Sequence, residues 1–387
     1  MATTPKKRGD LSSVLGRPCK GDLSSYPVEI IRQIKAIRIN HPGWGAQTIQ
    51  IELVKTTPYG LRELPSISAI HRYLKQEGLV KPTVPRSSVP SVSTSRKIKR
   101  VHDLWELDAQ GAVKVAGIGY QALINIKDIK SKVHCMAFPV NLASVHSQSK
   151  VTPYYWSLRL AFLQWGFPKV IQVDKASVFF ESTSKSPFPT LFHLWLVGLG
   201  MELKFITKPP PAQNASVERA HQTMEKQAIQ GQHYTCWKYF FKYCNERRKR
   251  MNEDLPNRSL GKKAPLQVFP NAAHSARPYS LETEQELVDF KRIHRHLAKY
   301  TWYRKVGKNK TLSLGGHKYY VKNALPQSYV QIKFCNRAKK LVFRNGKEQI
   351  LAKCPIKKID HLALMGNNTK GLKTTFYKIN HFKDFIL

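Results

Sequence analysis

Acidic residues are scarce in this sequence, so the positions where they occur are informative. The chain of 387 residues holds 25 Asp and Glu against 64 Lys and Arg. Asp108 ends a hydrophobic stretch in WELDAQG, Asp174 follows another in IQVDKASVF, and Glu218 stands in NASVERAHQ after a proline-rich turn. The first two are expected at the ends of strands, and the third in the opening turns of a helix. Such positions can converge in space although they are far apart in sequence.

Three converging carboxylates repel one another, and divalent cations relieve that repulsion. In a chain that binds nucleic acid, they predict two metal ions acting on a phosphodiester. One ion would activate the attacking water or 3′-hydroxyl, and the other would stabilise the leaving oxygen. Hard oxygen ligands favour Mg²⁺, for which Mn²⁺ can substitute. Taken singly, Asp108 and Asp174 also fit turn or cap residues, and Glu218 fits a plain electrostatic preference for a helix N-terminus.

The charge balance indicates the partner. A net charge of +39 predicts a polyanion such as double-stranded DNA, although a packaging protein would be equally basic. A hydrophobic fraction of 42% is enough for several folded domains. The six cysteines form no CxxC pair, so neither a zinc site nor a disulfide framework is expected. No apolar run reaches the length of a membrane span or forms a signal core, so we expect a cytoplasmic protein.

A basic tail (1–26) precedes a helical unit at 27–80. Three short helices, beginning near Pro27, Gln47 and Ser66, predict a helix-turn-helix, with an ordinary three-helix bundle as the alternative. In the first case the third helix enters the major groove of DNA. Its outward residues would contact bases and phosphates: Ser68, His71, Arg72 and Lys75.

The next segment, 81–100, is rich in Pro, Ser and basic residues and contains no acid, which predicts an extended linker. It would lie along a DNA backbone or act as a solvated tether. Its candidate DNA contacts are Arg96, Lys97, Lys99 and Arg100.

Residues 101–275 change to strands followed by alternating helices and strands, which predicts an α/β sheet covered by helices. The expected strands are 104–109, 120–126, 133–140, 169–173 and 202–206. The expected helices are 152–166, 188–199 and 214–230.

A connecting helix is expected within 276–299, followed by a small β-barrel at 300–365 and a tail at 366–387. Gly315-Gly316 and Asn345-Gly346 are hairpin signals. Residues 300–360 hold 15 Lys or Arg and 2 acids, so this barrel is also expected on DNA, with Lys339 and Lys340 as contacts.

At its carboxylate motifs the chain resembles bacterial insertion-sequence transposases of the DDE group, which are related to retroviral integrases. The resemblance extends from HPGWGAQTI to GGHKYYV and is most specific in WELDAQG, IQVDKASVF and NASVERAHQ. It implies a helix-turn-helix, a ribonuclease-H-like catalytic core and a C-terminal β-barrel. It also implies that Asp108, Asp174 and Glu218 are the catalytic residues and the ligands of both metal ions.

The activity implied by the resemblance is cleavage that frees a 3′-hydroxyl at the element's end, followed by strand transfer into target DNA. The enzyme would be a homo-oligomer associated with DNA in a bacterial cytoplasm, because two element ends must be held together. Arg219 and Lys208 would face phosphate. The basic, aromatic tail either contacts an AAA+ ATPase, as in some related transposases, or is a chain end without a partner.

Three departures from the family pattern stand near these residues. Lys175-Ala176 and Asn214-Ala215 replace the usual Asn-Gly pairs, and the spacing between Asp174 and Glu218 exceeds the usual one, with the surplus expected in 181–189. Lys175 would contact DNA phosphate or compete with metal for the carboxylate. The alternatives therefore include a catalytically inactive, domesticated DNA-binding protein and a nuclease of the same fold that never joins strands.

Overall fold

The computed structural model describes residues 23–58, 63–80, 98–142, 150–181, 184–206 and 215–366. The chain divides into two compact units. One comprises residues 1–90 with 225–233, and the other residues 91–224 with 234–387. Two separate hydrophobic clusters, one in each unit, account for this division. Most of the predicted basic tail, of the linker and of the C-terminal tail lies outside the described residues.

The first unit contains the three expected short helices: α2 (Val28–Asn40), α3 (Ala46–Thr56) and α4 (Ile67–Gln76). Their apolar faces meet in a core that includes Ile34, Ile49 and Ile70. Ser66 caps α4, because its hydroxyl accepts the N–H of Ala69 at 3.2 Å. The connection between α3 and α4 spans residues 57–66, which is longer than the three- or four-residue turn of a helix-turn-helix.

Residues 225–233 also belong to this first unit, although they follow α7 (Ala215–Met224) in sequence. They include a π-helical turn, η2 (Glu225–Ile229). The indole N–H of Trp44 donates to the carbonyl of Gln227 at 3.2 Å. A side chain at Gly43 would place its Cβ only 2.2 Å from the carbonyl oxygen of Lys226, so glycine is required at this close approach.

The second unit is built on a five-stranded sheet in the order β3-β2-β1-β4-β5. Strands β1 to β3 are antiparallel, whereas β4 is parallel to both β1 and β5. The sheet is therefore mixed, with helices packed on it, as the sequence predicted. The strands are β1 (Leu104–Val115), β2 (Gly119–Asp128), β3 (His134–Asn141), β4 (Val170–Val173) and β5 (Glu202–Phe205).

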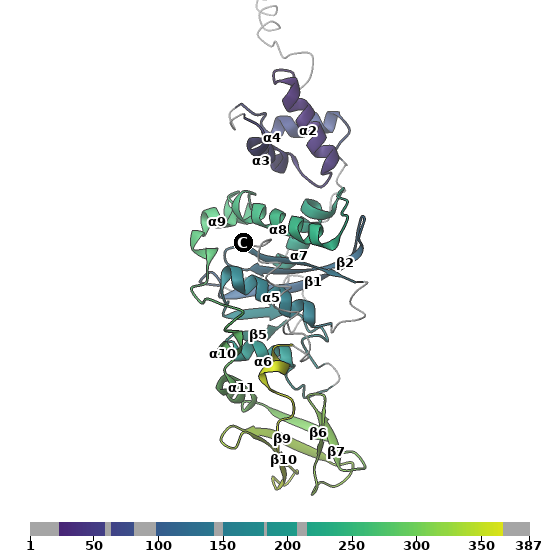
Figure 1. The fold of residues 1–387 in the computed structure, drawn as a ribbon, viewed down its shortest axis with the longest axis vertical. Helices are drawn as coiled ribbons and strands as arrows, with labels where there is room; N and C mark the ends of the chain where they lie inside the picture. Colours follow the sequence, from purple (N-terminus) through teal and green to yellow (C-terminus); the bar gives the residue numbers. More distant parts are fainter. Residues whose placement is uncertain are drawn as a thin grey trace, which may run out of the picture. The chain divides into compact units, whose positions relative to one another are not determined.

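Helices cover both faces of this sheet. In Figure 1, α7 and α8 lie along one side of the sheet and α5 along the other. The helices around the sheet are α5 (Thr152–Trp165), α6 (Leu191–Gly198), α7 and α8 (Trp237–Glu253). Short helical turns follow: η3 (Arg258–Leu260), α9 (Pro265–Val268) and η4 (Pro270–Ala273).

The predicted connecting helix is two short helices, α10 (Glu284–Leu287) and α11 (Phe290–Leu297). The break has a local cause, because the Asp289 carboxylate accepts the N–H of Lys291 at 2.7 Å and starts a new helix. Glu284, at the start of α10, is buried and accepts two hydrogen bonds from Arg159 of α5, each at 2.8 Å. Trp195 and Tyr279 donate to the same carboxylate at 2.7 and 2.6 Å.

The prediction of a C-terminal β-barrel was wrong for the described residues. Four strands form an open antiparallel sheet in the order β11-β10-β9-β6, and β7 with β8 forms a separate hairpin. The sheet does not close because β6 and β11 remain at opposite edges. The elements are β6 (Thr301–Lys305), β7 (Thr311–Leu314), β8 (His317–Tyr320), β9 (Tyr329–Cys335), β10 (Lys340–Arg344), β11 (Ile350–Pro355) and α12 (His361–Leu364).

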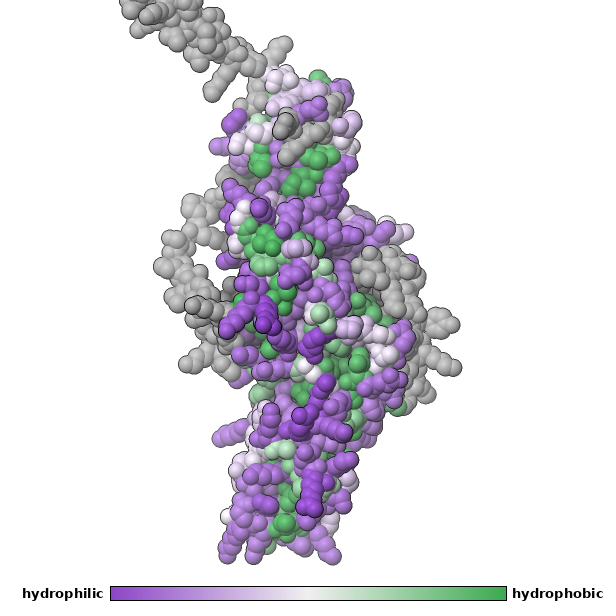
Figure 2. All heavy atoms as spheres, turned by 90° about the vertical axis from the view of Figure 1, so that its left-hand side faces the viewer, coloured by the Kyte–Doolittle hydropathy of each residue, from purple (hydrophilic) through white to green (hydrophobic). Residues whose placement is uncertain are grey.

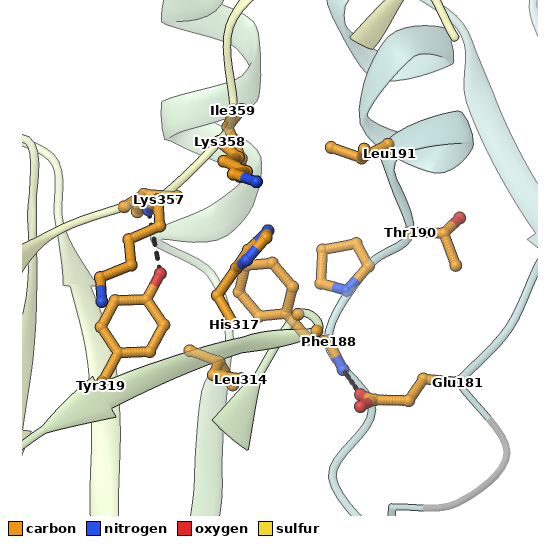
Figure 3. A pocket seen from close by; sticks show the side chains of 14 residues that line it. Glu181, Phe188, Thr190, Leu191, Leu314, His317, Tyr319, Lys357, Lys358 and Ile359 are labelled. Carbon is orange, nitrogen blue, oxygen red and sulfur yellow. Dashed lines mark hydrogen bonds between the residues drawn. The ribbon is translucent and has the colours of Figure 1, made fainter. Parts of the chain in front are cut away.

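The hydrophobic core of the second unit continues from the five-stranded sheet into this C-terminal segment. At the junction, the ring of Phe188 packs so closely on Gly315 that a Cβ there would lie 2.9 Å from it. A cavity of about 230 Å³ opens beside this contact (Figure 3). Its lining combines Glu181, His317, Lys357 and Lys358 with apolar side chains such as Phe188 and Leu314.

On the face shown in Figure 2, hydrophilic side chains predominate and hydrophobic ones form small, separated patches. Within the described ranges, we find no helix with the length and apolar character that crossing a bilayer requires.

Candidate active site

Strand β1 directs alternate side chains to the two faces of the sheet. Trp105 is fully buried, and its ring centroid lies 6.0 Å from that of Phe162 on α5. Asp108 faces the α7 side instead, where its Oδ2 lies 3.4 Å from Nε2 of His221. The side chain of Asp108 retains 23% of its exposure, so solvent reaches this carboxylate.

The pairing of β1 with β4 brings Asp108 and Asp174 together. These parallel strands pair Leu104 with Val170 and Glu106 with Gln172. Continued by two residues, that register sets Asp108 beside Asp174, which directly follows the last residue of β4. Neighbouring strands lie about 4.8 Å apart, so Asp108, within β1, and Asp174, directly after β4, are neighbours on two adjacent strands of the sheet.

Tyr154, on α5, is a common neighbour of the two aspartates. Burial raises the pKa of its phenol to about 12, and the negative charges of Asp174 and Asp108 add to that rise. Its ring also packs edge-on against Phe179, with a centroid distance of 4.8 Å. The phenol therefore remains protonated at neutral pH beside the carboxylate pair. Nothing in the sequence separates Tyr154 from the core aromatic residues of α5.

Asp174 is exposed, and its Oδ1 accepts the N–H of Ala176 at 3.1 Å. The Nζ of the next residue, Lys175, lies over the Phe180 ring, 5.6 Å from its centroid. Throughout the described ranges, no Lys or Arg forms an ion pair with Asp108, Asp174 or Glu218.

Glu218 lies exposed in the first turn of α7, which packs across β1 and β2. The sheet anchors the beginning of this helix at two points. The backbone N–H of Val217 faces the Glu106 carboxylate and lowers its pKa. The Lys127 ammonium donates to the carbonyl of Ser216 at 3.4 Å. Strand β1 therefore supplies both Asp108 and a contact that positions the helix carrying Glu218.

Glu106 is buried and Lys127 half-buried, and removal from water disfavours the charged form of each. It raises the pKa of Glu106 to about 7, against the opposing effect of the Lys127 charge. It lowers the pKa of Lys127 to about 8, and the nearby Lys132 adds to that fall. Sequence reasoning missed both residues, since only the strand register places them under α7.

The metal ligands predicted from the sequence are brought together only in part. Among the described residues, no group of three His, Cys, Asp or Glu side chains lies close enough to hold a metal ion. The strand register sets Asp108 beside Asp174, whereas Glu218 is carried by a separate element, α7. The two aspartates offer the hard oxygen ligands that Mg²⁺ prefers, so these neighbouring residues fit a divalent cation.

The predicted DNA-contacting residues of the first unit share one face of α4. This face is opposite the one that buries Ile70 and Leu74. All four residues are exposed: Ser68, His71, Arg72 and Lys75.

In the second unit the predicted cations that can be described are also exposed: Lys99, Arg100, Lys175, Arg219, Lys339 and Lys340. Arg219 is close enough to Lys127 and Lys132 to lower the pKa of both. Arg96, Lys97 and Lys208 lie outside the described residues.

No protein-family model and no curated protein matches the chain. Among solved structures, it is similar to the HTLV-2 integrase catalytic core domain in complex with magnesium. The dimeric form is 12% identical with a TM-score of 0.31, over 43% of this chain and 96% of that chain. The trimeric form is 12% identical with a TM-score of 0.30, over 43% and 95%.

The catalytic core domain of BIV integrase is 13% identical with a TM-score of 0.32, over 44% of this chain and 95% of that chain. Structural neighbours of this chain are therefore retroviral integrase catalytic cores, at low identity and over less than half of its length.

Proposed function

We propose that the chain is a DDE transposase or integrase, which cleaves DNA at the ends of a mobile element and transfers the freed 3′-hydroxyl into target DNA. One observation carries the proposal. The register of β1 and β4 sets Asp108 beside Asp174 at a solvent-reached part of the sheet, with no Lys or Arg paired to either within the described ranges. In a chain of net charge +39, such a site fits the phosphodiester backbone of nucleic acid. The sequence motifs favour the bacterial insertion-sequence group.

Asp108 and Asp174 would hold divalent ions, with Glu218 joining them from α7. Two Mg²⁺ ions, or Mn²⁺ in their place, would activate the attacking hydroxyl and stabilise the leaving oxygen when bound. The chain itself supplies orientation. The backbone N–H of Ala109 and the ring of His221 hold the two oxygens of Asp108.

Double-stranded DNA is the proposed partner, and two basic surfaces support it. The first is the exposed face of α4, which would act as the reading helix of a helix-turn-helix-like unit. The second is the C-terminal open sheet, whose Lys339 and Lys340 are exposed. The enzyme would act as a homo-oligomer, because the two ends of an element must be cut and joined together.

One observation favours a second candidate, a DNA-binding protein of the same architecture without catalysis. In the part of the chain that the structure describes, the three carboxylates do not form one metal-binding group. The two candidates share every DNA-binding surface and differ only in whether the chain cuts.

The test uses the full-length protein with labelled DNA from the flanks of its own gene, in Mg²⁺ and separately in Ca²⁺. Variants Asp108→Ala, Asp174→Ala and Glu218→Ala are assayed beside it. Glu202→Ala is the matched control. Glu202 is exposed on the same sheet. Its backbone pairs with that of Val170, at the opposite end of β4 from Asp174.

We expect Mg²⁺-dependent nicks and joined products from the wild type and Glu202→Ala, and neither product from the other three variants. Nicks without joined products would instead indicate a nuclease. Specific binding of those flanks without any cleavage would establish the non-catalytic candidate.

A further inference from the structure

Three buried side chains form a series of hydrogen bonds that ends on Asp108. Nε2 of His134, on β3, lies 2.8 Å from Oδ1 of Asn125 on β2. Nδ2 of Asn125 lies 2.5 Å from Nδ1 of His221 on α7. Nε2 of His221 in turn lies 3.4 Å from Oδ2 of Asp108. All three are buried, and Asn125 stands directly opposite Asp108 in the β1–β2 ladder.

The two ends of this series determine which group donates each hydrogen bond. The Asp108 carboxylate only accepts, so Nε2 of His221 must carry a proton to make a favourable contact. The amide nitrogen of Asn125 only donates, so the Nδ1 of His221 that faces it must accept. The carbonyl oxygen of Asn125 is left to accept from Nε2 of His134.

The opposite direction is unfavourable at the active site. Turning the Asn125 amide over would place its oxygen on Nδ1 of His221, which would then carry the proton. The unprotonated Nε2 would face the negative charge of Asp108. Burial also holds the pKa of His134 well below its usual range, so its ring is neutral and carries a single proton. Its Nδ1 makes no hydrogen bond to the described part of the chain, and the backbone of Met136 opposes the fall in the pKa.

His134, the residue of this series farthest from Asp108, is held rigidly. Asn252 of α8 accepts the backbone N–H of His134 at 2.8 Å and donates to its carbonyl at 3.0 Å. The buried guanidinium of Arg248 donates to the same carbonyl at 3.1 Å. Helix α8 therefore fixes His134, which in turn positions the amide of Asn125.

We propose that His134 and Asn125 form with His221 a positioning relay, which fixes the proton of His221 on Nε2 and so orients Asp108 toward its metal ion. With Ala109 donating to Oδ1 at 2.9 Å, each oxygen of Asp108 has one hydrogen bond and keeps a lone pair for the metal. The relay residues touch neither substrate nor metal and act only through Asp108. This role rests on the proposed function.

The first test reads the protons directly, without metal or DNA. Long-range ¹H–¹⁵N spectra of the full-length protein, labelled with ¹⁵N-histidine, distinguish the two tautomers at neutral pH. His134→Gln and His221→Gln assign the signals. We expect both histidines to carry the proton on Nε2, and His221 to lose this single tautomer in Asn125→Leu. A proton on Nδ1 of His221 in the wild type would overturn the relay.

The second test measures Mn²⁺ affinity from the electron paramagnetic resonance signal of the free ion. Loss of a side chain that orients a metal ligand typically weakens binding about 10- to 100-fold, and we expect this of Asn125→Leu. Gln121→Leu is the matched control, since Gln121 is buried on the same strand and donates to Ile118. We expect it to bind Mn²⁺ like the wild type.

A pair of variants keeps the test decisive if Asn125→Leu fails to fold. The amide of Gln reaches the position of Nε2 in His221, whereas that of Asn reaches only the position of Nδ1. His221→Gln should therefore retain more Mn²⁺ affinity than His221→Asn. Equal affinity in the two would overturn the relay.

Failure of the relay and failure of the proposed function give different results. If the wild type binds Mn²⁺ and Asp174→Ala does not, the metal site stands, and unchanged binding by a folded Asn125→Leu overturns the relay alone. If Asp174→Ala binds as well as the wild type, the metal site and the relay's role toward it are both overturned.

Discussion

Two sets of carboxylates in the second unit differ sharply in their surroundings. Glu284 is buried and saturated, since Arg159, Trp195 and Tyr279 direct four hydrogen bonds at its two oxygens. Asp108, within β1, and Asp174, directly after β4, are reached by solvent and have no Lys or Arg as ion-pair partner in the described part of the chain. A carboxylate that folding requires is neutralised within the protein. One that keeps its charge and its lone pairs is available for a ligand from outside.

The largest effect expected from this contrast is on stability. Glu284→Ala leaves the Arg159 guanidinium buried and unpaired, so we expect unfolding to become easier by about 3–5 kcal/mol. Asp174→Ala should change the free energy of unfolding by no more than about 0.5 kcal/mol, as is usual at exposed positions. Urea unfolding measures both. Glu286→Ala, an exposed neighbour of Glu284 on α10, is the control. Similar losses from Glu284→Ala and Asp174→Ala would remove the contrast.

The next effect is stabilisation by metal. A divalent ion that binds only the folded protein stabilises it by about 2.7 kcal/mol at a hundredfold excess over its Kd. We expect Mg²⁺ to raise the unfolding free energy of the wild type and of Glu284→Gln, but not of Asp174→Asn. Urea unfolding with and without Mg²⁺ reads this directly. A Mg²⁺ effect that survives in Asp174→Asn would place the ion elsewhere.

The loss of stability at acidic pH should depend on the buried His134. Burial holds its folded pKa well below 6.5, and the facing charges of Arg248, Lys127 and His221 act in the same direction. The unfolded chain therefore takes up a proton first as the pH falls. The free energy of unfolding is therefore unaffected by this ring above pH 6.5. Below pH 6.5 it falls, by up to about 1.4 kcal/mol per pH unit.

His134→Gln should flatten this loss in unfolding curves recorded from pH 7 to pH 5. His193 is a comparison, because burial, aided by His296, lowers its pKa to about 3. His193→Gln should flatten the curve in the same sense. A curve for His134→Gln that runs parallel to that of the wild type would contradict the account.

The smallest expected effect concerns Lys175, which the sequence presents as a competitor for metal. Its ammonium lies over the Phe180 ring, a contact worth about 0.5–1 kcal/mol. Lys175→Met should cost no more stability than that and should leave the Mg²⁺ affinity unchanged. Mn²⁺ or Mg²⁺ titration provides the measurement. Markedly tighter binding by the variant would show that Lys175 pairs with Asp174 and would weaken the contrast drawn above.

Features set by neighbouring residues could be predicted from the sequence. Proline near its start and Gly166 at its end mark α5, and Gly166 adopts the positive φ of 73° that glycine allows. Ser66 is the cap of α4 as expected. The strand end placed Asp174 correctly, directly after β4, because the hydrophobic run before it is a local signal. Asp108 was expected at a strand end but lies within β1, which continues to Val115 by pairing with β2.

Features that depend on long-range pairing of strands or side chains could not be predicted from the sequence. Whether the C-terminal strands close into a barrel depends on which edges pair, and no turn signal encodes that. Asn125 and His134 carry no local mark, because only the register of β1, β2 and β3 aligns them with His221. Glu284 was missed for the same reason, since its partner Arg159 lies 125 residues away in the chain.

The most direct test of the central claim is to replace Mg²⁺ with Fe²⁺ in the full-length protein and locate where the backbone is cut by hydroxyl radicals generated at the bound iron. The account predicts cuts close to Asp108 and Asp174, suppressed by excess Mg²⁺ and absent from Asp174→Ala. Cuts confined to other segments, or unchanged in that variant, would contradict the assignment of this part of the sheet as the metal-binding active site.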